Sequence, residues 1–342
     1  MKPQPVRELC FVVPALDGPI TGGTLYNREL CVALEHTATR VVVCQPGATN
    51  LRAALRTANH LWVDSLYLAA LPDIAREATT RVGLLAHYLP SFVACGRAPR
   101  PSELSREESR ALSCVDSFLV TSDYMREAFE PLVAPEKPIL VAPPGSHARL
   151  APTPPIPSFG LRASSIGNVV PGKGLAPLLA ALAELLAVED RFELSIVGSL
   201  SLDGAYAAHC QRTIASSAAL SARVRLLGAC SPEQTALVLG QSEHLVSASC
   251  MESFGMALAE ARIAGIPILA CAGGNAATHV AADAGGQLVE NPRELAAACV
   301  ALARDPGRVQ RRIGRAREHA RPARTWSETA QVLLAQLGNL EK

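Results

Sequence analysis

Short apolar runs alternate with helical segments along almost the whole chain, and this alternation limits the fold more than any other feature of the sequence. In the first half, the runs LCFVVPA, RVVVCQP, SFLVTS and PILVAPP are separated by helical patterns near residues 26–35, 103–114 and 123–129. The second half repeats the rhythm, with FELSIVGS, RVRLLGA and IPILACA between helical patterns near 175–186, 205–216, 232–239 and 256–264. Apolar strands that alternate with helices indicate parallel sheets covered on both faces.

A proline-rich stretch near the middle of the chain separates the two halves. Nine of the 25 prolines lie between Pro131 and Pro157, and the stretch ends in PTPPIPS. In a chain of 342 residues, such a stretch is typical of an interdomain linker. We therefore predict an α/β protein with two doubly wound, Rossmann-like domains, residues 1–151 and 159–321. A linker over 152–158 joins them, and a last amphipathic helix occupies 322–342.

Composition and charge exclude several classes of protein. The chain is 49% hydrophobic and carries a net charge of +1, which argues against a disordered segment or a protein built to coat nucleic acid. The arginine-rich segment at residues 305–324 is better interpreted as a solvated helix face than as a nucleic-acid or membrane patch. The ten cysteines are scattered singly without a CxxC pair, and no signal-peptide or 18-residue apolar run occurs. These features predict free thiols and a cytoplasmic location.

Two glycine-containing segments lie where strands lead into helices. In PALDGPITGGTLYNREL, Gly22 and Gly23 precede a helix, so that the backbone can approach a phosphate closely, although a tight structural turn explains them equally well. In SSIGNVVPGKGLAP, Lys173 stands between Gly172 and Gly174 in a chain with only four lysines and 28 arginines. An ammonium group at that place can act as a point charge on a diphosphate, and the alternative is a solvated turn lysine.

A third segment, SASCMESFGMALAEARIAGIPILA, combines two carboxylates with a helix start. Glu252 lies in the loop after a strand, and Glu260 lies inside the helix that follows. Backbone N–H groups at the start of that helix favour an anion. Taken alone, Glu260 is equally compatible with a solvated surface carboxylate.

Together these segments resemble a known family. The stretch ESFGMALAE is similar to the E-x-F-G-x-x-x-x-E signature of the retaining family 4 glycosyltransferases, which have the GT-B fold and are also classed as glycosyl transferases group 1. GNVVPGKG resembles the family's G-R-x-x-P-x-K-G motif. The segments TGGTLYNREL, LLAHYLPS, ILVAPPG and IPILACAGG resemble further family segments in the same order, so that the resemblance covers nearly the whole chain.

The resemblance implies a transferase that moves a hexosyl unit from a nucleotide-diphosphate sugar to an acceptor, with retention of configuration and without a metal or other cofactor. The two domains would face each other across a cleft, with the acceptor on the first and the donor mainly on the second, and the C-terminal helix would cross back. By analogy, Lys173 would bind the diphosphate, Glu252 the sugar hydroxyls and Glu260 the ribose, while His87 would lie near the transferred sugar. The implied catalytic set is His87, Lys173 and Glu252. The implied donor set is Gly22, Gly23, Asn168, Lys173, Glu252, Ser253, Phe254, Gly255, Met256 and Glu260.

Three positions depart from the family pattern. Asn168 stands where the family has an arginine, Glu243-His244 stands where it has an aspartate, and residues 273–277 replace its Pro-Glu. The loss of the arginine leaves open a non-catalytic scaffold on a decayed transferase fold, and a sugar phosphorylase using the same site also stays open. A nucleotide-dependent oxidoreductase is disfavoured because the G-x-G-x-x-G fingerprint is missing. The donor base, the donor sugar and the acceptor, whether carbohydrate, lipid-linked or small molecule, are left open, as is peripheral membrane contact.

Overall fold

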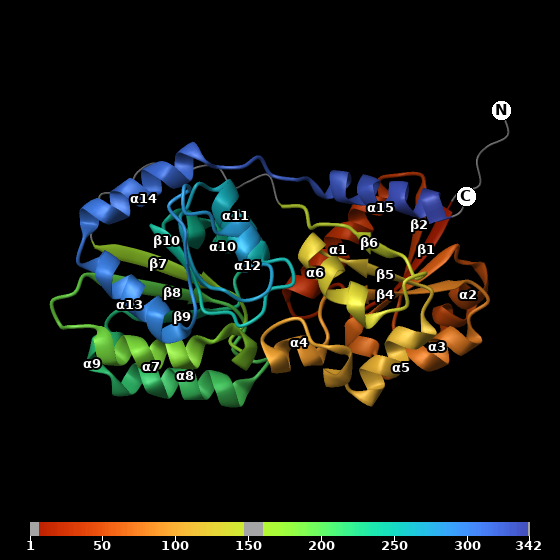
Figure 1. The fold of residues 1–342 in the computed structure, drawn as a ribbon, viewed down its shortest axis with the longest axis horizontal. Helices are drawn as coiled ribbons and strands as arrows, with labels where there is room; N and C mark the ends of the chain where they lie inside the picture. Colours follow the sequence, from red (N-terminus) through yellow and green to blue (C-terminus); the bar gives the residue numbers. More distant parts are fainter. Residues whose placement is uncertain (1–6, 147–159, 341–342) are drawn as a thin grey trace. The chain divides into compact units, whose positions relative to one another are not determined.

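The chain folds into two compact units, each built on its own parallel sheet (Figure 1). A computed structural model describes residues 7–146 and 160–340. Unit 1 comprises Met1–Ser146 and Arg324–Lys342, and unit 2 comprises His147–Ala323. The predicted linker over 152–158 lies outside the described residues. Two parallel sheets flanked by helices confirm the predicted α/β class.

Unit 1 contains a six-stranded sheet in the order β2-β1-β3-β4-β5-β6, and every neighbouring pair is parallel. The chain returns from β2 past β1 to form β3, so the strand order reverses between β1 and β3. Ligands of open α/β sheets bind beside the carboxyl ends of the strands at such a reversal. The strands are β1 Arg7–Val12, β2 Thr39–Cys44, β3 His60–Asp64, β4 Arg81–Ala86, β5 Ser117–Val120 and β6 Ile139–Val141.

Helices cover both faces of the unit 1 sheet. Figure 1 shows α1 and α15 on one side of the sheet and α3 and α5 on the other. The helices are α1 Gly22–Glu35, α2 Thr49–Thr57, α3 Leu71–Glu77, α4 Pro90–Cys95, α5 Arg106–Cys114, α6 Asp123–Phe129 and α15 Trp326–Leu340, with 3-10 turns at Ser65–Tyr67, Pro101–Glu103 and Glu130–Leu132.

The last helix, α15, packs along the edge strand β6 and hydrogen-bonds to it. The side-chain amide of Gln336 accepts a hydrogen bond from Val141 N at 3.0 Å and donates one to Val141 O at 2.8 Å, so both backbone groups of Val141 on this edge strand are paired. Thr329 Oγ1 donates to Pro143 O at 2.7 Å. Gly145 packs so tightly that a Cβ there would lie 2.5 Å from Trp326 N. The predicted return of the C-terminal helix to the first half of the chain is thereby confirmed.

Unit 2 contains a second parallel sheet in the order β12-β11-β10-β7-β8-β9. Its strand order reverses between β7 and β10. The strands are β7 Leu161–Ile166, β8 Phe192–Val197, β9 Val224–Gly228, β10 His244–Ser247, β11 Ile268–Cys271 and β12 Gln287–Val289. The helices are α7 Leu175–Leu185, α8 Gly204–Ser216, α9 Ala218–Ser221, α10 Pro232–Gly240, α11 Met256–Ile263, α12 Ala276–His279, α13 Pro292–Ala303 and α14 Pro306–Glu318.

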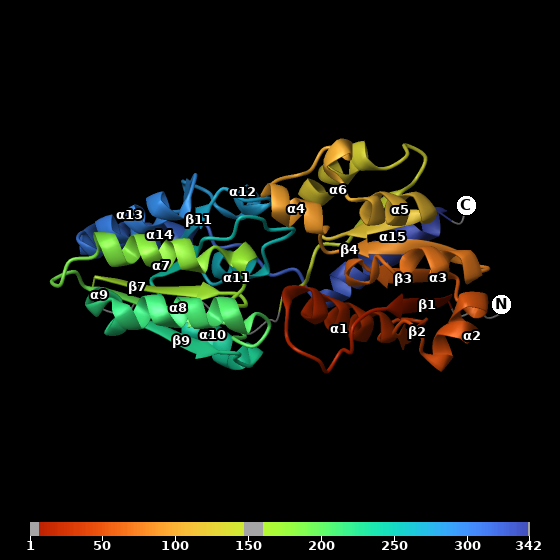
Figure 2. The ribbon, with the colours of Figure 1, turned by 90° about the horizontal axis from the view of Figure 1, so that it is seen from below.

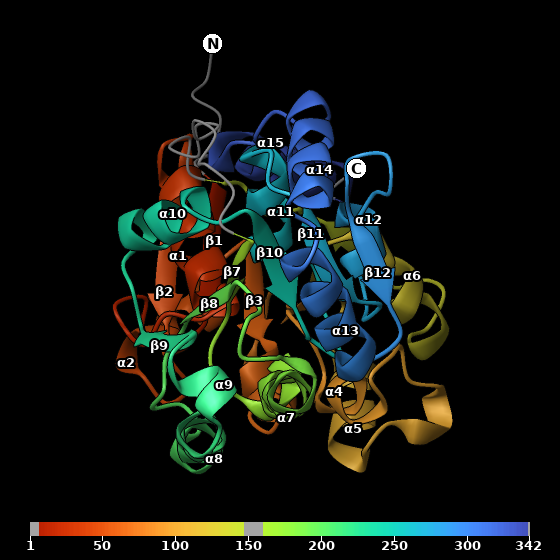
Figure 3. The same cartoon turned by 90° about the vertical axis from the view of Figure 1, so that its left-hand side faces the viewer.

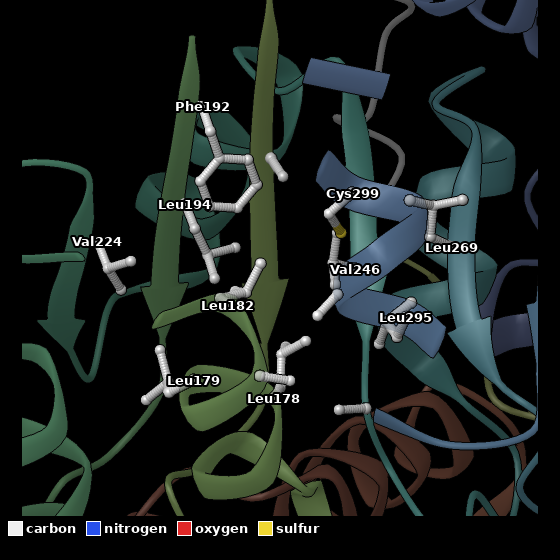
Figure 4. Close-up of a cluster of buried hydrophobic side chains, with 14 of the residues drawn as sticks. Leu178, Leu179, Leu182, Phe192, Leu194, Val224, Val246, Leu269, Leu295 and Cys299 are labelled. Carbon is white, nitrogen blue, oxygen red and sulfur yellow. The ribbon is translucent and has the colours of Figure 1, made fainter. Parts of the chain in front are cut away.

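The unit 2 sheet buries both faces because neighbouring residues along a strand point to opposite sides. In β10, Val246 joins the larger core with α7 and α13, whereas Leu245 joins a smaller core with α10 and α11. Figure 2 shows α7 and α8 running side by side, and Figure 3 shows α7, α8 and α9 on one side of the sheet with α10 and α11 on the other. In Figure 4, Phe192 and Leu194 of β8 point toward Leu182 of α7. Each fully buried side chain of this size contributes about 1.5–3 kcal/mol.

Several short helices are not apparent from the sequence, and one helix begins later than predicted. Helices α3, α4, α9 and α12 have four to seven residues, too few to show a clear 3.6-residue period. The helix expected from residue 103 begins at Arg106, because Ser105 and Glu108 form a capping box. The arginine-rich segment forms α14, which buries Val309 and Ile313 and exposes most of its arginines, as the solvated-face interpretation predicts. Among the described residues, no helix is long and apolar enough to cross a membrane.

Candidate functional site

Lys173 and Glu252 follow the two strands between which the unit 2 sheet reverses. Lys173 ends a short 3-10 turn, Pro171–Lys173, in the loop after β7, and Glu252 lies in the loop after β10. Because β7 and β10 are parallel neighbours, both loops leave the same edge of the sheet. The sequence therefore places these two charged side chains at the position where such folds bind ligands.

An ion pair joins the two side chains. Lys173 Nζ lies 2.6 Å from Glu252 Oε1 and 3.5 Å from Ser249 Oγ. The side chains remain partly accessible, at 33% for Lys173 and 14% for Glu252. The ammonium group is thus neutralised locally but open to solvent, which lets an anionic ligand replace the carboxylate. Gly174 has φ +62°, and a Cβ there would lie 2.1 Å from Ala248 O, so the two loops meet backbone against backbone.

Two residues that were not predicted from the sequence, Asn275 and His279, hydrogen-bond to the backbone of the loop from Glu252 to Gly255. Asn275 N donates to Glu252 O at 2.7 Å, and Asn275 Nδ2 donates to Phe254 O at 2.7 Å. His279 Nε2 lies 2.7 Å from the same Phe254 carbonyl. The available signal was the departure from the family pattern at residues 273–277, because Asn275 stands inside it.

Helix α11 starts directly after this loop. Gly255 adopts φ +89° as its N-cap residue, and Met256 is the first helical residue. Its first turn carries no acidic side chain, so the backbone N–H groups at this terminus are available to an anion. Ser253 and Phe254 are partly exposed beside it.

Glu260 lies in the second turn of α11. Burial raises the pKa of Glu260 from 4.5 to about 7. Its carboxylate has neither a hydrogen bond nor an ion pair among the residues that the structure describes, so nothing there offsets the cost of desolvating the charge. A ligand that donates hydrogen bonds to this carboxylate would stabilise its ionised form.

Asn168, which replaces the family's arginine, connects two loops by a hydrogen bond. Its Oδ1 accepts a hydrogen bond from Ser199 N at 2.8 Å, which ties the loop after β7 to the loop after β8. Asn168 therefore adds no positive charge at the predicted diphosphate site. Of the described residues in this neighbourhood, Lys173 carries the positive charge closest to Glu252.

In unit 1, the structure brings Gly22, Gly23 and His87 together. Gly22 and Gly23 open α1 behind the N-cap Thr21, and a Cβ on Gly23 would lie 3.1 Å from the His87 ring. His87 follows β4, and its Nε2 lies 2.8 Å from the side-chain oxygen of the buried Asn27. Gly22, Gly23 and His87 were all predicted from the sequence, whereas Asn27 was not.

The structure thus groups the predicted site residues into one set on each unit. Lys173, Glu252 and residues 253–256 lie together on unit 2 with Asn168 nearby in the loop after β7, and Gly22, Gly23 and His87 lie together on unit 1. Their roles toward a ligand stay predictions. Within the described part of the chain, no group of three or more His, Cys, Asp or Glu side chains is arranged to hold a metal ion.

The sequence of unit 2 is similar to the sequences of known proteins. Residues 160–319, nearly all of unit 2, match the family described as Glycosyl transferases group 1. A D-inositol 3-phosphate glycosyltransferase of Nocardia farcinica is 30% identical over 270 residues, which cover 73% of this chain and 58% of that protein. The corresponding protein of Rhodococcus jostii is 32% identical over 173 residues, which cover 49% of this chain and 38% of that protein. The matches thus span little more than half the length of the first relative and less of the second.

Solved structures with little sequence identity share the fold. Sucrose-phosphate synthase from Thermosynechococcus elongatus superposes with a TM-score of 0.76 at 18% identity, covering 98% of this chain and 99% of that chain. The Anabaena protein HepE in complex with UDP and glucose superposes with a TM-score of 0.75 at 16% identity, covering 97% of this chain and all of that one. These similarities confirm the predicted GT-B type of fold, with two doubly wound sheets in one chain.

Proposed function

We propose that this chain, whose residues 160–319 match the group 1 glycosyltransferases, transfers a hexosyl unit from a nucleotide-diphosphate sugar to an acceptor. The proposal includes retention of anomeric configuration and independence of a bound metal. The observation that carries it is the Lys173–Glu252 pair at the strand reversal of unit 2, where a positive charge and a hydrogen-bond acceptor lie 2.6 Å apart.

In the proposed reaction, the bond between C1 of the sugar and the diphosphate oxygen breaks, and the nucleoside diphosphate leaves with the electron pair. A new bond forms between C1 and an acceptor hydroxyl oxygen, and the proton of that hydroxyl is released. Charge therefore builds up on the diphosphate in the transition state. An ammonium group and backbone N–H donors stabilise this charge without a covalent nucleophile.

Lys173 and Glu252 divide these tasks in the proposed mechanism. The diphosphate competes with Glu252 for Lys173, because the ammonium group is partly exposed and its present partner is a single carboxylate. Once displaced, Glu252 accepts hydrogen bonds from hydroxyl groups of the donor sugar. The N-terminus of α11 adds N–H donors, and Glu260 accepts hydrogen bonds from the ribose hydroxyls.

The donor site is tested by a thermal-shift panel of UDP, GDP, ADP, CMP, NAD and NADP in the presence of EDTA. UDP comes first because HepE, a structure of the same fold, is in complex with UDP. A ligand that binds only the folded state and is present at 100 Kd adds about 2.7 kcal/mol to the free energy of unfolding. We expect one nucleoside diphosphate to stabilise the protein and both Lys173→Ala and Glu260→Ala to remove the effect.

Two results would contradict the proposal. Either no diphosphate raises the melting temperature, or the shift persists in both variants. A non-catalytic scaffold would then be the better interpretation. Inorganic phosphate as an acceptor distinguishes the phosphorylase alternative, since only a phosphorylase would release a sugar phosphate. D-Inositol 3-phosphate is the first acceptor to test, because the relatives of this chain are called D-inositol 3-phosphate glycosyltransferases.

Donor binding should depend on pH through Glu260. Its pKa of about 7 means that the carboxylate is mostly protonated at pH 6 and mostly ionised at pH 8. Because only the ionised form accepts hydrogen bonds at both oxygens, we expect the affinity for the stabilising diphosphate to rise about tenfold from pH 6 to pH 8. Titration calorimetry at pH 6, 7 and 8 measures this dependence.

The Glu260→Gln variant separates this effect from titration of the ligand's own phosphates. It should bind more weakly and lose the part of the pH dependence that belongs to Glu260. The free protein gives a second readout: the native state holds this proton more tightly than the unfolded chain, so its stability falls as pH rises from about 4.5 to about 7. Glu260→Gln should remove that decline, and identical pH profiles for both proteins would refute the assignment.

A further inference from the structure

Three polar side chains from separate elements form a buried hydrogen-bonded chain in unit 1. Asn27 lies on α1, Asp64 is the last residue of β3, and His87 follows β4. Asn27 Nδ2 donates to Asp64 Oδ2 at 2.7 Å, and Asn27 Oδ1 lies 2.8 Å from His87 Nε2. Asn27 is 0% exposed and Asp64 is 1% exposed. This series of hydrogen bonds runs from Asp64, beside the strand reversal between β1 and β3, to the ring of His87.

The hydrogen bonds at Asp64 identify it as the acceptor end of this chain. Its Oδ1 accepts from Leu66 N at 2.9 Å, and a backbone N–H can only donate. Its Oδ2 lies 2.7 Å from the side-chain nitrogen of Asn27 and 3.5 Å from His87 Nε2. A carboxylate that accepts at both oxygens forces the amide group of Asn27 to turn its NH₂ toward Asp64.

The orientation of the Asn27 amide determines where the His87 ring carries its proton. With the NH₂ group directed at Asp64, the amide oxygen faces His87 Nε2, and an oxygen of this kind can only accept. Nε2 must therefore be the protonated nitrogen. Burial lowers the pKa of His87, and the nearby Asp64 opposes that shift only in part, so the ring is neutral near pH 7. In a neutral ring with Nε2 protonated, Nδ1 is a hydrogen-bond acceptor.

The packing around the ring leaves Nδ1 on its open side. A Cβ on Gly23 would lie 3.1 Å from Cδ2 and 3.4 Å from both Cγ and Nε2, so α1 covers the Cδ2 side of the ring, which is opposite Nδ1 and Cε1. Tyr26 contacts the ring edge-on at 5.3 Å, and its hydroxyl donates to Ala142 O. Nδ1 has no hydrogen-bond partner among the described residues, and the His87 side chain is 10% exposed.

We propose that Asn27 and Asp64 are positioning residues that hold His87 in the Nε2-protonated form, so that Nδ1 accepts a hydrogen bond from a hydroxyl group of the sugar. The proposal rests on the proposed glycosyl transfer for the nature of the ligand. A neutral hydrogen-bond acceptor atom such as Nδ1, next to a buried carboxylate, suits a hydroxyl group. It disfavours a phosphate, because a fully ionised phosphate has no proton to donate and would be repelled by Asp64.

The protonation site can be read directly in the free protein. Long-range ¹H–¹⁵N correlation spectra of protein labelled with ¹⁵N-histidine distinguish the two neutral forms, and His87→Gln assigns the resonance. We expect the Nε2-protonated form of His87 to exceed the other by at least about tenfold at pH 7.5, the ratio given by one well-formed hydrogen bond. A ring protonated mainly at Nδ1, or at both nitrogens, would overturn the proposal.

Substitutions at Asn27 test the positioning role. Asn27→Asp removes the NH₂ group and places a second carboxylate beside Asp64, and we expect the His87 ring to become doubly protonated at pH 7.5. Asn27→Ser keeps a small polar side chain but no longer reaches both partners, and we expect a mixture of neutral forms. His60, another buried histidine of unit 1 that pairs with Ser117 Oγ at 3.0 Å, should keep its spectrum in both variants. An unchanged His87 spectrum in both variants would show that Asn27 does not position the ring.

The role of Nδ1 is tested with UDP-glucose, GDP-mannose and ADP-glucose against the matching diphosphates. The sugar nucleotide whose diphosphate stabilises the protein should shift the Nδ1 resonance of His87, and the diphosphate alone should not. If that diphosphate binds and its sugar nucleotide leaves Nδ1 unchanged, the assigned role of Nδ1 is wrong. If no diphosphate binds, the proposed function fails instead, whereas the spectra of the free protein still decide the positioning of the ring.

Discussion

Glu252→Gln should lower kcat/KM for glycosyl transfer by about 10²–10³-fold, the expected effect of removing one positioned hydrogen-bonding group from the reacting centre. The same change releases Lys173 from its ion pair at 2.6 Å. Binding of the nucleoside diphosphate alone should therefore stay equal or become tighter. The expected signature is thus a loss of transfer without a loss of diphosphate affinity, measured by steady-state kinetics and by calorimetry on the same samples.

A matched control exists on the same unit. Glu184 forms an ion pair with Arg293 at the same N–O distance of 2.6 Å, but both side chains are largely exposed, at 59% and 66%. Glu184→Gln should leave transfer and diphosphate binding unchanged, because exposed pairs contribute little. Equal kinetic losses in the two variants, or full activity in Glu252→Gln, would contradict the role proposed for Glu252.

Gly274→Ala should displace the loop that carries Glu252 and lower the free energy of unfolding by about 3 kcal/mol. Gly274 has φ +58°, and a Cβ there would lie 2.3 Å from Glu252 O and 2.8 Å from Glu252 N. The new methyl group meets backbone rather than a flexible side chain, so the Glu252 loop has to move. We expect the stabilisation by the nucleoside diphosphate to disappear, as measured by thermal unfolding with and without ligand.

Gly228→Ala separates backbone strain from this contact. Gly228 lies in the same unit with φ +73°, but its Cβ would meet nothing within 4 Å. Gly228→Ala should lower the free energy of unfolding by about 1–2 kcal/mol, because only the left-handed backbone conformation is disfavoured, and it should still bind the diphosphate. If both alanine variants lose the same stability and both still bind the ligand, the contact between Gly274 and the Glu252 loop has no role in the site.

The sequence by itself determined the α/β class, the division into two halves and the segments that surround the site on unit 2. The alternation of apolar runs with helical patterns is local, since it reflects which faces of one segment are buried. The glycines beside Lys173 and the ESFGMALAE stretch are local as well, because each marks a strand-to-helix turn. Such features can be recognised before the strand order is known.

Only the tertiary structure decided how the side chains pair. Three residues far apart in sequence meet in this way: Asn27, Asp64 and His87. They meet because β3 and β4 are neighbours and α1 lies beside the carboxyl ends of both strands. Asn275 reaches the Phe254 carbonyl through the loop after β11 in the same way. Hydrogen-bond partners depend on strand order and on the approach of loops, and neither is encoded in the period or spacing of a single segment.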